Sequence, residues 1–300
     1  MGDQVIALEV ALADGTLLRT RAVSRHSTGP RLERLFIGAE GTLGIITAAA
    51  VRGFAIPESQ TLRAYRFPDF EAGFRAIDRM AALGLRPSLL DYGEEHASPW
   101  PELHSRDEEP PTLFLGFEGF TQEVGASLFR AEKIIRGEGG TDLPWDLVRE
   151  FWDDRHVVAE RFQRGRRERG GNWMGDVARD WIHVALPPSS VLTFRERCHA
   201  ETAASGVALL ECGLWTGPEL FSSVLAAPMA DNGFGRLNGV VDTLLTAAQD
   251  LGGSMEYVHG AGVRYAHLMP REHGAAFDVL RRLKAAIDPD GTLNPGKLGL

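Results

Sequence analysis

The sequence predicts an α+β fold in which helices cover one face of an antiparallel sheet. Two successive rounds of strand and helix can be read, at 62–67, 70–83 and 86–92 and then at 112–117 and 123–136. Apolar residues alternate with polar ones in the strands and recur every three or four positions in the helices. Further strands are predicted at 181–186, 207–215 and 220–227, followed by a helix at 237–251. Returning strands after two such rounds favour antiparallel pairing with the helices on one side.

The N-terminal segment predicts a β-hairpin. Residues 5–12 and 17–22 alternate in polarity around Ala13-Asp14-Gly15-Thr16. An Asp-Gly pair between two alternating runs is a strong local hairpin signal, because glycine adopts the positive φ angles that tight turns require. The chain then passes through a turn at 27–30 and a short amphipathic piece at 31–34.

Length and charge limit the possible partners. The chain has 300 residues, of which 44% are hydrophobic, enough to build one large domain or two ordinary ones. Its formal charge of −9 argues against nucleic-acid and anionic-membrane binding, since both depend on an excess of Lys and Arg. One basic cluster remains open between a solvated loop and an anion-binding patch; it comprises Arg161, Arg164, Arg166, Arg167 and Arg169.

The cysteines and the hydropathy pattern indicate a cytoplasmic protein. Cys198 and Cys212 are too few for a disulfide framework and lack metal-ligand spacing. No apolar run approaches the length of a membrane span, and the N-terminus has no signal-peptide pattern. We therefore expect no metal site and no membrane span.

A glycine-rich stretch at 35–47 is the first candidate functional element. Gly38, Gly41 and Gly44 recur every three residues between two apolar runs. Glycines allow the main-chain N–H groups of a loop to approach a ligand closely, as in many nucleotide-cofactor sites. The spacing differs from the Rossmann fingerprint. From these residues alone, a structural loop and a cofactor loop both remain open.

The whole string Gly-Ala-Glu-Gly-Thr-Leu-Gly-Ile-Ile-Thr at 38–47, preceded by Leu-Phe-Ile, closely resembles a motif of the FAD-linked oxidases of the vanillyl-alcohol oxidase type. Ala39 stands where that motif has serine. The resemblance implies FAD as the cofactor. The residues it implies as cofactor-binding are Gly38, Ala39, Glu40, Gly41, Gly44, Ile45 and Ile46.

The C-terminus carries a second resemblance to the same family. An amphipathic helix is predicted at 271–287, with Phe277, Leu280, Leu283 and Ile287 on one face. The following Asp-Pro-Asp-Gly-Thr-Leu-Asn-Pro-Gly-Lys is similar to the ending with which these oxidases return to the flavin lobe. The resemblance implies that Asn294 contacts the flavin, whereas we read Lys297 as a surface end charge.

A histidine before a Gly-x-Gly sequence is the candidate base. Residues 255–258 are predicted as a strand that ends at His259, and small neighbours at Gly260 and Gly262 leave room for a ligand. Imidazole suits proton transfer near neutral pH, although a lone histidine is more often structural. The segment resembles the flavin-facing His-Gly-x-Gly of the family, which implies a catalytic His259. For Arg264, a substrate-anion clamp and a surface salt bridge both remain open.

Two departures from the family bear on its metal-dependent and transferase branches. The metal-dependent hydroxy-acid dehydrogenases carry an acidic residue where this chain has Val258, and a His-x-Gly-Asp-Gly-Asn-x-His segment where it reads Ala208 to Thr216. The synthases that build an ether-lipid precursor carry a Ser-His-x-Tyr group near the position of Leu214-Trp215. A metal site is therefore not expected, and the transferase reading is weakened.

The resemblance implies three parts: the C-terminal part of an FAD-binding domain at 1–57, a substrate or cap domain at 58–270, and a helix and tail returning to the flavin lobe at 271–300. The first 30 residues contain no Pro-x-Gly-Gly-Gly-like loop of the kind that cradles the FAD pyrophosphate. We therefore expect either a fragment or a companion chain that supplies this lobe.

The implied function is oxidation of a CH–OH group of a small, anionic hydroxy acid by an FAD-dependent oxidoreductase, with hydride transfer to the flavin N5 atom. Two alternatives remain: an alkylglycerone-phosphate synthase-like transferase, and a non-catalytic remnant or one subunit of a split flavoprotein.

Overall fold

The structure is a computed structural model that describes residues 2–97, 109–154, 157, 160, 163, 164, 167 and 176–300. The chain forms two compact units. Unit 1 comprises Met1–Ala55 and Val258–Leu300, and unit 2 comprises Ile56–Tyr257. The sequence-based boundaries lay at 57/58 and 270/271, so residues 258–270 belong to unit 1 by their contacts rather than to the cap.

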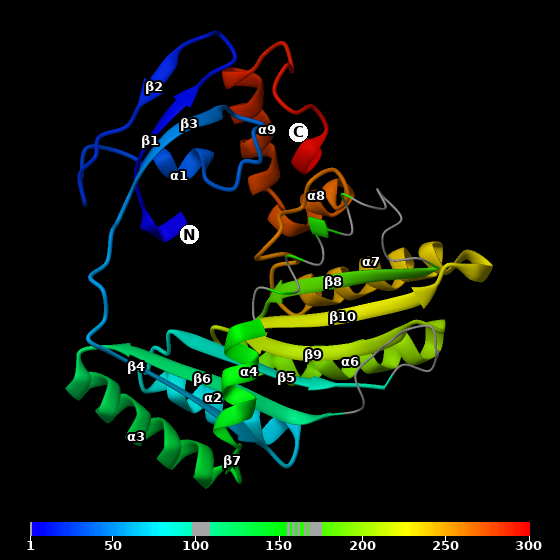
Figure 1. Ribbon diagram of the computed structural model, residues 1–300. Coiled ribbons are helices and arrows are strands. Elements are labelled where there is room, and N and C mark those ends of the chain that lie inside the picture. The colour runs from blue at the N-terminus through cyan, green and yellow to red at the C-terminus, as the bar shows by residue number, and fades with distance from the viewer. Residues whose placement is uncertain are drawn as a thin grey trace. The chain divides into compact units, whose positions relative to one another are not determined.

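Unit 1 contains a three-stranded antiparallel sheet of order β2-β1-β3 and a group of short helices (Figure 1). Its elements are η1 (Gly2–Gln4), β1 (Val5–Ala11), β2 (Leu17–Arg19), α1 (Glu33–Phe36), β3 (Ile45–Val51), η5 (Ala266–Leu268), α8 (Met269–His273), α9 (Ala276–Ile287) and η6 (Lys297–Gly299).

The predicted N-terminal hairpin is confirmed. Ala11 pairs with Leu17, and Gly15 has a φ of +83° in the turn between them. The Asp14 carboxylate accepts a hydrogen bond of 2.8 Å from the Thr16 N–H, which closes the turn. Behind the hairpin, the core of unit 1 consists of Leu8, Val10, Phe36, Ala39 and Leu43, with Ile287 of α9 packed against it.

The predicted helix at 271–287 is broken into α8 and α9. Gly274 ends α8 with a φ of +51° and a ψ of −130°, far from the dihedral angles of a helix. The predicted amphipathic face persists in α9, in which Phe277 is buried.

Unit 2 is built on a seven-stranded antiparallel sheet of order β7-β4-β6-β5-β9-β10-β8. Its strands are β4 (Ser59–Arg66), β5 (Leu89–Glu95), β6 (Glu109–Gly119), β7 (Thr141–Asp142), β8 (Val177–Ala185), β9 (Ala208–Trp215) and β10 (Leu220–Pro228). Its helices are α2 (Phe70–Ala82), α3 (Thr121–Gly137), α4 (Trp145–Asp154), η3 (Pro188–Ser190), α6 (Val191–Ser205), η4 (Ala230–Asn232) and α7 (Gly233–Asp250).

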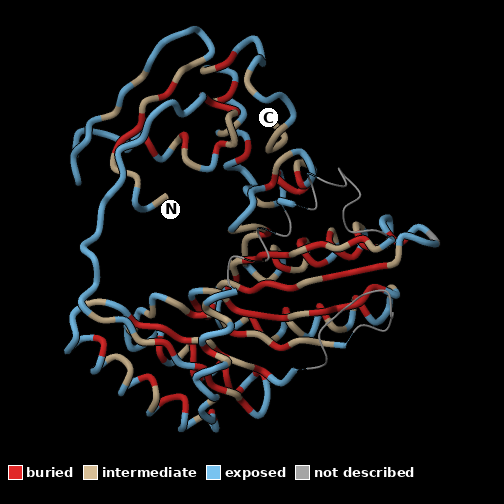
Figure 2. Tube along the Cα trace, viewed as in Figure 1, coloured by how far each residue is buried: buried red, intermediate tan, exposed pale blue. Residues whose placement is uncertain are grey.

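Helices cover one face of this sheet, as the sequence predicted, although α6 was not among the helices expected. α2 and α3 pack on the half formed by β4, β5 and β6, and α6 and α7 pack on β8, β9 and β10 (Figure 1). Tyr92 on β5 and Phe221 on β10 point to this face, because both rings contact Phe70 of α2. The interior strands are mostly buried in Figure 2. The α+β class and the antiparallel sheet are thus confirmed.

The opposite face is covered over one part by α4. Along β4, side chains alternate between the two faces, so Leu62 and Ala64 point away from Tyr65 and pack against Val148 of α4. Phe114 of β6 stacks on Phe151 with ring centroids 3.8 Å apart. The prediction of helices on a single face is therefore wrong at α4.

The predicted strand at 255–258 is also wrong. Ser254 forms one isolated bridge with Ala185 of β8, and the Tyr257 N–H then donates to the His183 carbonyl oxygen at 3.2 Å. After these contacts the chain turns away, with positive φ angles at Gly260 and Gly262. Within the described residues, no helix is both long and apolar enough to cross a membrane.

Candidate functional site

The glycine loop of unit 1 is held by its inward-facing residues. Ala39 and Leu43 lie in the core, and the Thr42 hydroxyl donates to the Ala39 carbonyl oxygen at 2.7 Å. Gly44 is buried against β1, where an added Cβ would lie 2.5 Å from Val10 Cγ1. Gly38 and Gly41 have φ angles of +81° and +76°; Gly38 is exposed, whereas Gly41 is half-buried against Asn294. The loop is therefore packed on one side and open at Gly38 on the other.

Glu40 joins the loop to the two other motifs of the chain. Its Oε1 atom accepts a hydrogen bond of 3.0 Å from the Gly262 N–H, within the His-Gly-x-Gly segment. Its backbone carbonyl accepts a bond of 2.7 Å from Asn294 Nδ2, and Lys297 Nζ lies 3.3 Å from its Oε2. Three segments that the sequence singled out separately thus meet at one residue.

A buried lysine makes a second connection between two of these segments, the glycine loop and the C-terminal turn. Lys284 Nζ, on α9, donates to the Thr42 carbonyl at 2.9 Å and to the Leu293 carbonyl at 2.7 Å, and it forms an ion pair with the buried Asp288. The Lys284 ammonium and the N–H groups of Leu293 and Thr292 hold the pKa of Asp288 well below its usual range, against the effect of burial. The glycine loop and the C-terminal turn are fixed by a charge that no motif revealed.

The proposed catalytic residues lie on the surface of unit 1. His259 and Arg264 are both exposed, and the Arg264 guanidinium lies 5.0 Å from the centre of the Tyr265 ring. His259 lies three residues before Gly262, whose N–H donates to the Glu40 side chain. The backbone that carries His259 is therefore anchored to the glycine loop.

The remaining residues implied by the resemblance differ in exposure. Ile45 and Ile46 begin β3 with 57% and 44% of their surfaces exposed, and Asn294 is exposed. Every residue of β3 is exposed (Figure 2), and within the described residues β3 pairs only with β1. An apolar strand with one open edge and little cover is the kind of surface that another segment normally occupies.

Unit 2 has a polar group on the sheet face opposite α2 and α6. Asp91 on β5 pairs in register with Trp215 on β9, and the Trp215 ring lies 5.1 Å from that of His183 on β8. The Tyr257 ring lies 5.8 Å from His183. Burial raises the pKa of Asp91 to about 6. A carboxyl group whose pKa approaches neutrality is a functional-site candidate that the sequence analysis missed.

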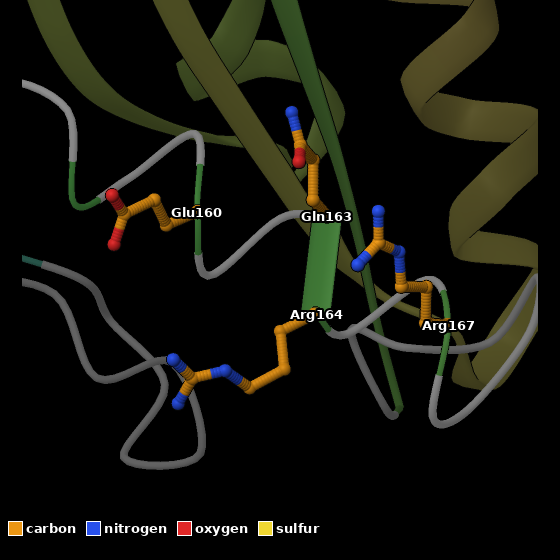
Figure 3. Close-up of a pocket in the computed structure, with 4 residues that line it drawn as sticks. All are labelled: Glu160, Gln163, Arg164 and Arg167. Atoms are coloured by element: carbon orange, nitrogen blue, oxygen red, sulfur yellow. The ribbon is translucent and has the colours of Figure 1, made fainter.

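The basic cluster at 161–169 falls partly outside the described residues, which exclude Arg161, Arg166 and Arg169. Arg164 and Arg167 line a pocket with Glu160 and Gln163 (Figure 3). The polar ends of these four side chains point in different directions in Figure 3 rather than toward one centre. This arrangement does not favour an anion site over a solvated surface.

Comparison with known proteins decides the family. Residues 56–298 match the model of the family described as FAD linked oxidases, C-terminal domain. The chain belongs to this family. The resemblance inferred from the motifs is therefore confirmed, and FAD is the cofactor that the family implies.

The curated relatives match almost the whole chain at low identity. A probable mitochondrial D-lactate dehydrogenase from Danio rerio is 26% identical over 312 residues, which cover 99% of this chain and 61% of the relative. An uncharacterized FAD-linked oxidoreductase of Escherichia coli K12 is 27% identical over 315 residues (99% and 63%), and the glycolate oxidase subunit GlcD of Bacillus subtilis is 22% identical over 316 residues (99% and 63%). The chain thus spans about three fifths of the length of these relatives.

Solved structures share the fold. A p-cresol methylhydroxylase structure aligns with a TM-score of 0.74 at 15% identity and covers 99% of this chain and 65% of that one. An alkyldihydroxyacetonephosphate synthase aligns with a TM-score of 0.65 at 16% identity, with 98% and 53% covered. At these identities the similarity establishes the architecture and leaves the reaction open.

Proposed function

We propose that this chain provides the substrate-side residues and part of the flavin contact surface of an FAD-dependent oxidoreductase that oxidises the CH–OH group of a small, anionic hydroxy acid. The supporting observation is the meeting of the glycine loop, the His-Gly-x-Gly segment and the C-terminal turn at Glu40. The names of the relatives, which include D-lactate dehydrogenases and a glycolate oxidase subunit, support the substrate class.

The outer side of the glycine loop fits a polar cofactor edge. Within the described residues, the N–H groups of Gly38 and Gly41 donate to no protein acceptor. An added Cβ at Gly38 would meet nothing within 4 Å, so the backbone there is open to approach. Ile45 and Ile46, which follow directly, offer exposed apolar surface. Donors beside an apolar patch suit a flavin ring, which carries carbonyl acceptors on a flat apolar body.

In the proposed reaction, His259 accepts the hydroxyl proton of the substrate while the planar guanidinium of Arg264 pairs with its carboxylate. Bound FAD would supply the acceptor for the hydride, two electrons and one proton, that leaves the carbinol carbon. The exposed His259 and Arg264 are five positions apart on a segment whose backbone Glu40 anchors. This anchoring limits the positions that the imidazole can take.

The exposed strand β3 supports a contribution from a further polypeptide segment. We propose that the segment supplying the pyrophosphate-binding lobe, either in cis or as a companion chain, covers β3. The apolar side chains at both ends of the strand, Ile45 and Val51, are 57% and 56% exposed. The cytoplasmic location stays a prediction.

A histidine substitution tests the proposed base. In the FAD-loaded protein, assayed with D-lactate or glycolate and an artificial electron acceptor, His259→Asn should lower kcat roughly 10²- to 10⁴-fold, the usual contribution of a general base. Flavin content should not change. The control is His273→Asn, because His273 is also exposed and lies at the end of α8 in the same unit.

Arg264→Met should chiefly raise KM for the acid, because the arginine is proposed to bind the substrate anion.

Unchanged kcat in His259→Asn, with normal flavin content, would assign the base elsewhere. The polar group around Asp91 and His183 would then be the next candidate.

A further inference from the structure

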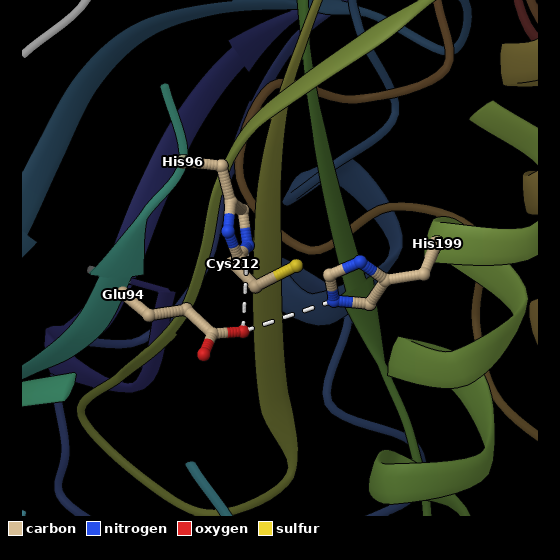
Figure 4. A group of neighbouring side chains, drawn as sticks. All are labelled: Glu94, His96, His199 and Cys212. Carbon is tan, nitrogen blue, oxygen red and sulfur yellow. Dashed lines mark ion pairs between the residues drawn. The ribbon is translucent and has the colours of Figure 1, made fainter. Parts of the chain in front are cut away.

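A cluster of potential metal ligands lies between the sheet and α6 in unit 2 (Figure 4). Glu94 on β5 stands directly opposite Cys212 on β9 in the strand register. His96 follows β5, where its N–H donates to the Leu210 carbonyl at 2.9 Å, and His199 projects from α6. One ligand atom from each of the four residues lies within 4.8 Å of every other.

We propose that Glu94, His96, His199 and Cys212 bind one divalent transition-metal ion of the zinc type, which ties β5, β9 and α6 together. The four residues would supply one sulfur, two nitrogen and one oxygen donor. This set suits tetrahedral Zn²⁺, whereas Mg²⁺ and Ca²⁺ select all-oxygen sites. Four protein ligands leave no open position, so the proposed role is structural.

The two imidazoles provide the second observation. The Nε2 atoms of His96 and His199 are shielded from solvent, yet neither has a hydrogen-bond partner among the described residues. They lie 3.5 and 3.9 Å from the Glu94 Oε1 atom, at or beyond the limit for a hydrogen bond. Buried polar atoms are normally satisfied, so two unsatisfied nitrogens beside one carboxylate require a reason. A metal ion between them would satisfy both.

Arg195 lies beside the cluster and would act as a positioning residue. Its Nε atom lies 2.6 Å from Glu94 Oε1, one helical turn before His199 on α6. A carboxylate ligand commonly accepts a hydrogen bond from such an outer residue while it binds the metal through another lone pair. Without a metal, Glu94 pairs with Arg195 and, when the imidazoles are protonated, also with His96 and His199. This arrangement is the competing explanation for the cluster.

The cluster is separate from the polar group around Asp91. Side chains along β5 alternate between the two faces, so Glu94 shares the helix-covered face with Tyr92, whose hydroxyl donates to the Phe70 carbonyl at 2.9 Å. Asp91 lies on the other face. Binding would replace the proton of the Cys212 thiol, which would pass to solvent as the sulfur–metal bond forms.

Metal titration of the intact chain tests the proposal. After treatment with a chelator, the protein should bind one equivalent of Zn²⁺, and Co²⁺ in its place should give a thiolate-to-cobalt charge-transfer band. Cys212→Ser should abolish this band, and His199→Gln should weaken Zn²⁺ binding by roughly 100-fold or more. The matched control is Cys198→Ala. Cys198 is a second buried thiol, which lies on α6 next to His199 but is not part of the cluster.

Zn²⁺ should also raise the Tm of the wild-type chain and of Cys198→Ala but not of His199→Gln. His199 is half-exposed, with a side-chain accessibility of 39%, so His199→Gln should fold even if Cys212→Ser does not. Failure of the chelator-treated protein to take up an equivalent of Zn²⁺ would overturn the proposal. A charge-transfer band that survives in Cys212→Ser would overturn it as well.

Discussion

Buried charge is treated differently in the two units. In unit 1, Asp288 is fully buried but contacts Lys284 and the N–H groups of Thr292 and Leu293. In unit 2, burial alone shifts the pKa of Asp91, and the described structure also shows unsatisfied buried atoms at Ser222 Oγ and Tyr257 OH. Unit 1 uses a buried ion pair to fix its loops, whereas unit 2, apart from the Glu94–Arg195 pair, retains buried polar groups whose hydrogen-bonding capacity is unused.

Among the variants that test this contrast, the one that removes the buried lysine should lower stability the most. Lys284→Met should lower the Tm of unit 1 by roughly 10 °C, because it leaves the Asp288 carboxylate buried without its counter-charge. Scanning calorimetry or thermal hydrogen exchange would measure the loss separately for each unit. The control Lys133→Met alters an exposed lysine on α3 and should leave both transitions in place.

The direction of the pH dependence follows from the pKa of Asp288. Because the folded-state pKa lies below the unfolded one, the stabilisation is complete above roughly pH 4 and is lost as pH falls through the folded-state pKa.

An equal loss of stability in Lys284→Met and Lys133→Met would mean that Lys284 does not fix the loops of unit 1.

Asp91 should show the opposite dependence on pH. Its pKa is raised by burial to about 6, so the folded state holds the proton more tightly than the unfolded chain. The contribution of Asp91 to stability should be largest below roughly pH 4 and should fall by about 3 kcal/mol as pH rises through 6. Asp91→Asn should remove this decline in denaturant titrations, whereas Asp146→Asn, at an exposed position on α4, should retain it. A decline that persists in Asp91→Asn would assign it to another group.

Alanine substitutions at Gly41 and Gly84 separate the cost of a clash with Asn294 from the cost of a strained backbone. Gly41 and Gly84 have the same φ of +76°, but an added Cβ at Gly41 would lie 2.6 Å from Asn294 Nδ2, whereas at Gly84 it would meet nothing within 4 Å. Gly41→Ala should therefore cost roughly 1 to 3 kcal/mol more than Gly84→Ala in denaturant unfolding. Equal costs would show that the Asn294 side chain moves aside without loss of stability. The C-terminal turn would then be less firmly fixed to the loop than the hydrogen bond between Asn294 and the Glu40 carbonyl indicates.

Features carried by neighbouring residues could be predicted from the sequence. The Asp14-Gly15 turn, the glycine loop and the C-terminal ending all consist of residues that act through their own backbone, so order along the chain is sufficient to recognise them. The antiparallel sheet followed from alternation in successive segments, and that prediction is confirmed. The strand expected at 255–258 failed because the chain meets the edge strand β8 at a single bridge and then leaves it.

Features assembled from distant residues could not be predicted in this way. Cys212 opposes Glu94 only once the register of β5 and β9 is known, so spacing along the chain gave no metal signal. Lys284 reads as an ordinary polar residue of an amphipathic helix, and its burial depends on carbonyls at Thr42 and Leu293. Asp91 likewise reads as one polar position in an alternating strand.

The most direct test of the account is the flavin content of two matched variants. Gly38 and Gly15 have φ angles of +81° and +83°, and an added Cβ at either position would meet nothing within 4 Å, but only Gly38 lies in the glycine loop. Each protein would be purified with and without a co-expressed pyrophosphate-binding lobe, and its absorbance read near ~370 and ~450 nm, where oxidised flavin absorbs. We predict flavin bands in the wild type and in Gly15→Val and their loss in Gly38→Val. Equal flavin content in the two variants, or none in the wild type with the lobe present, would contradict the proposed flavin contact surface.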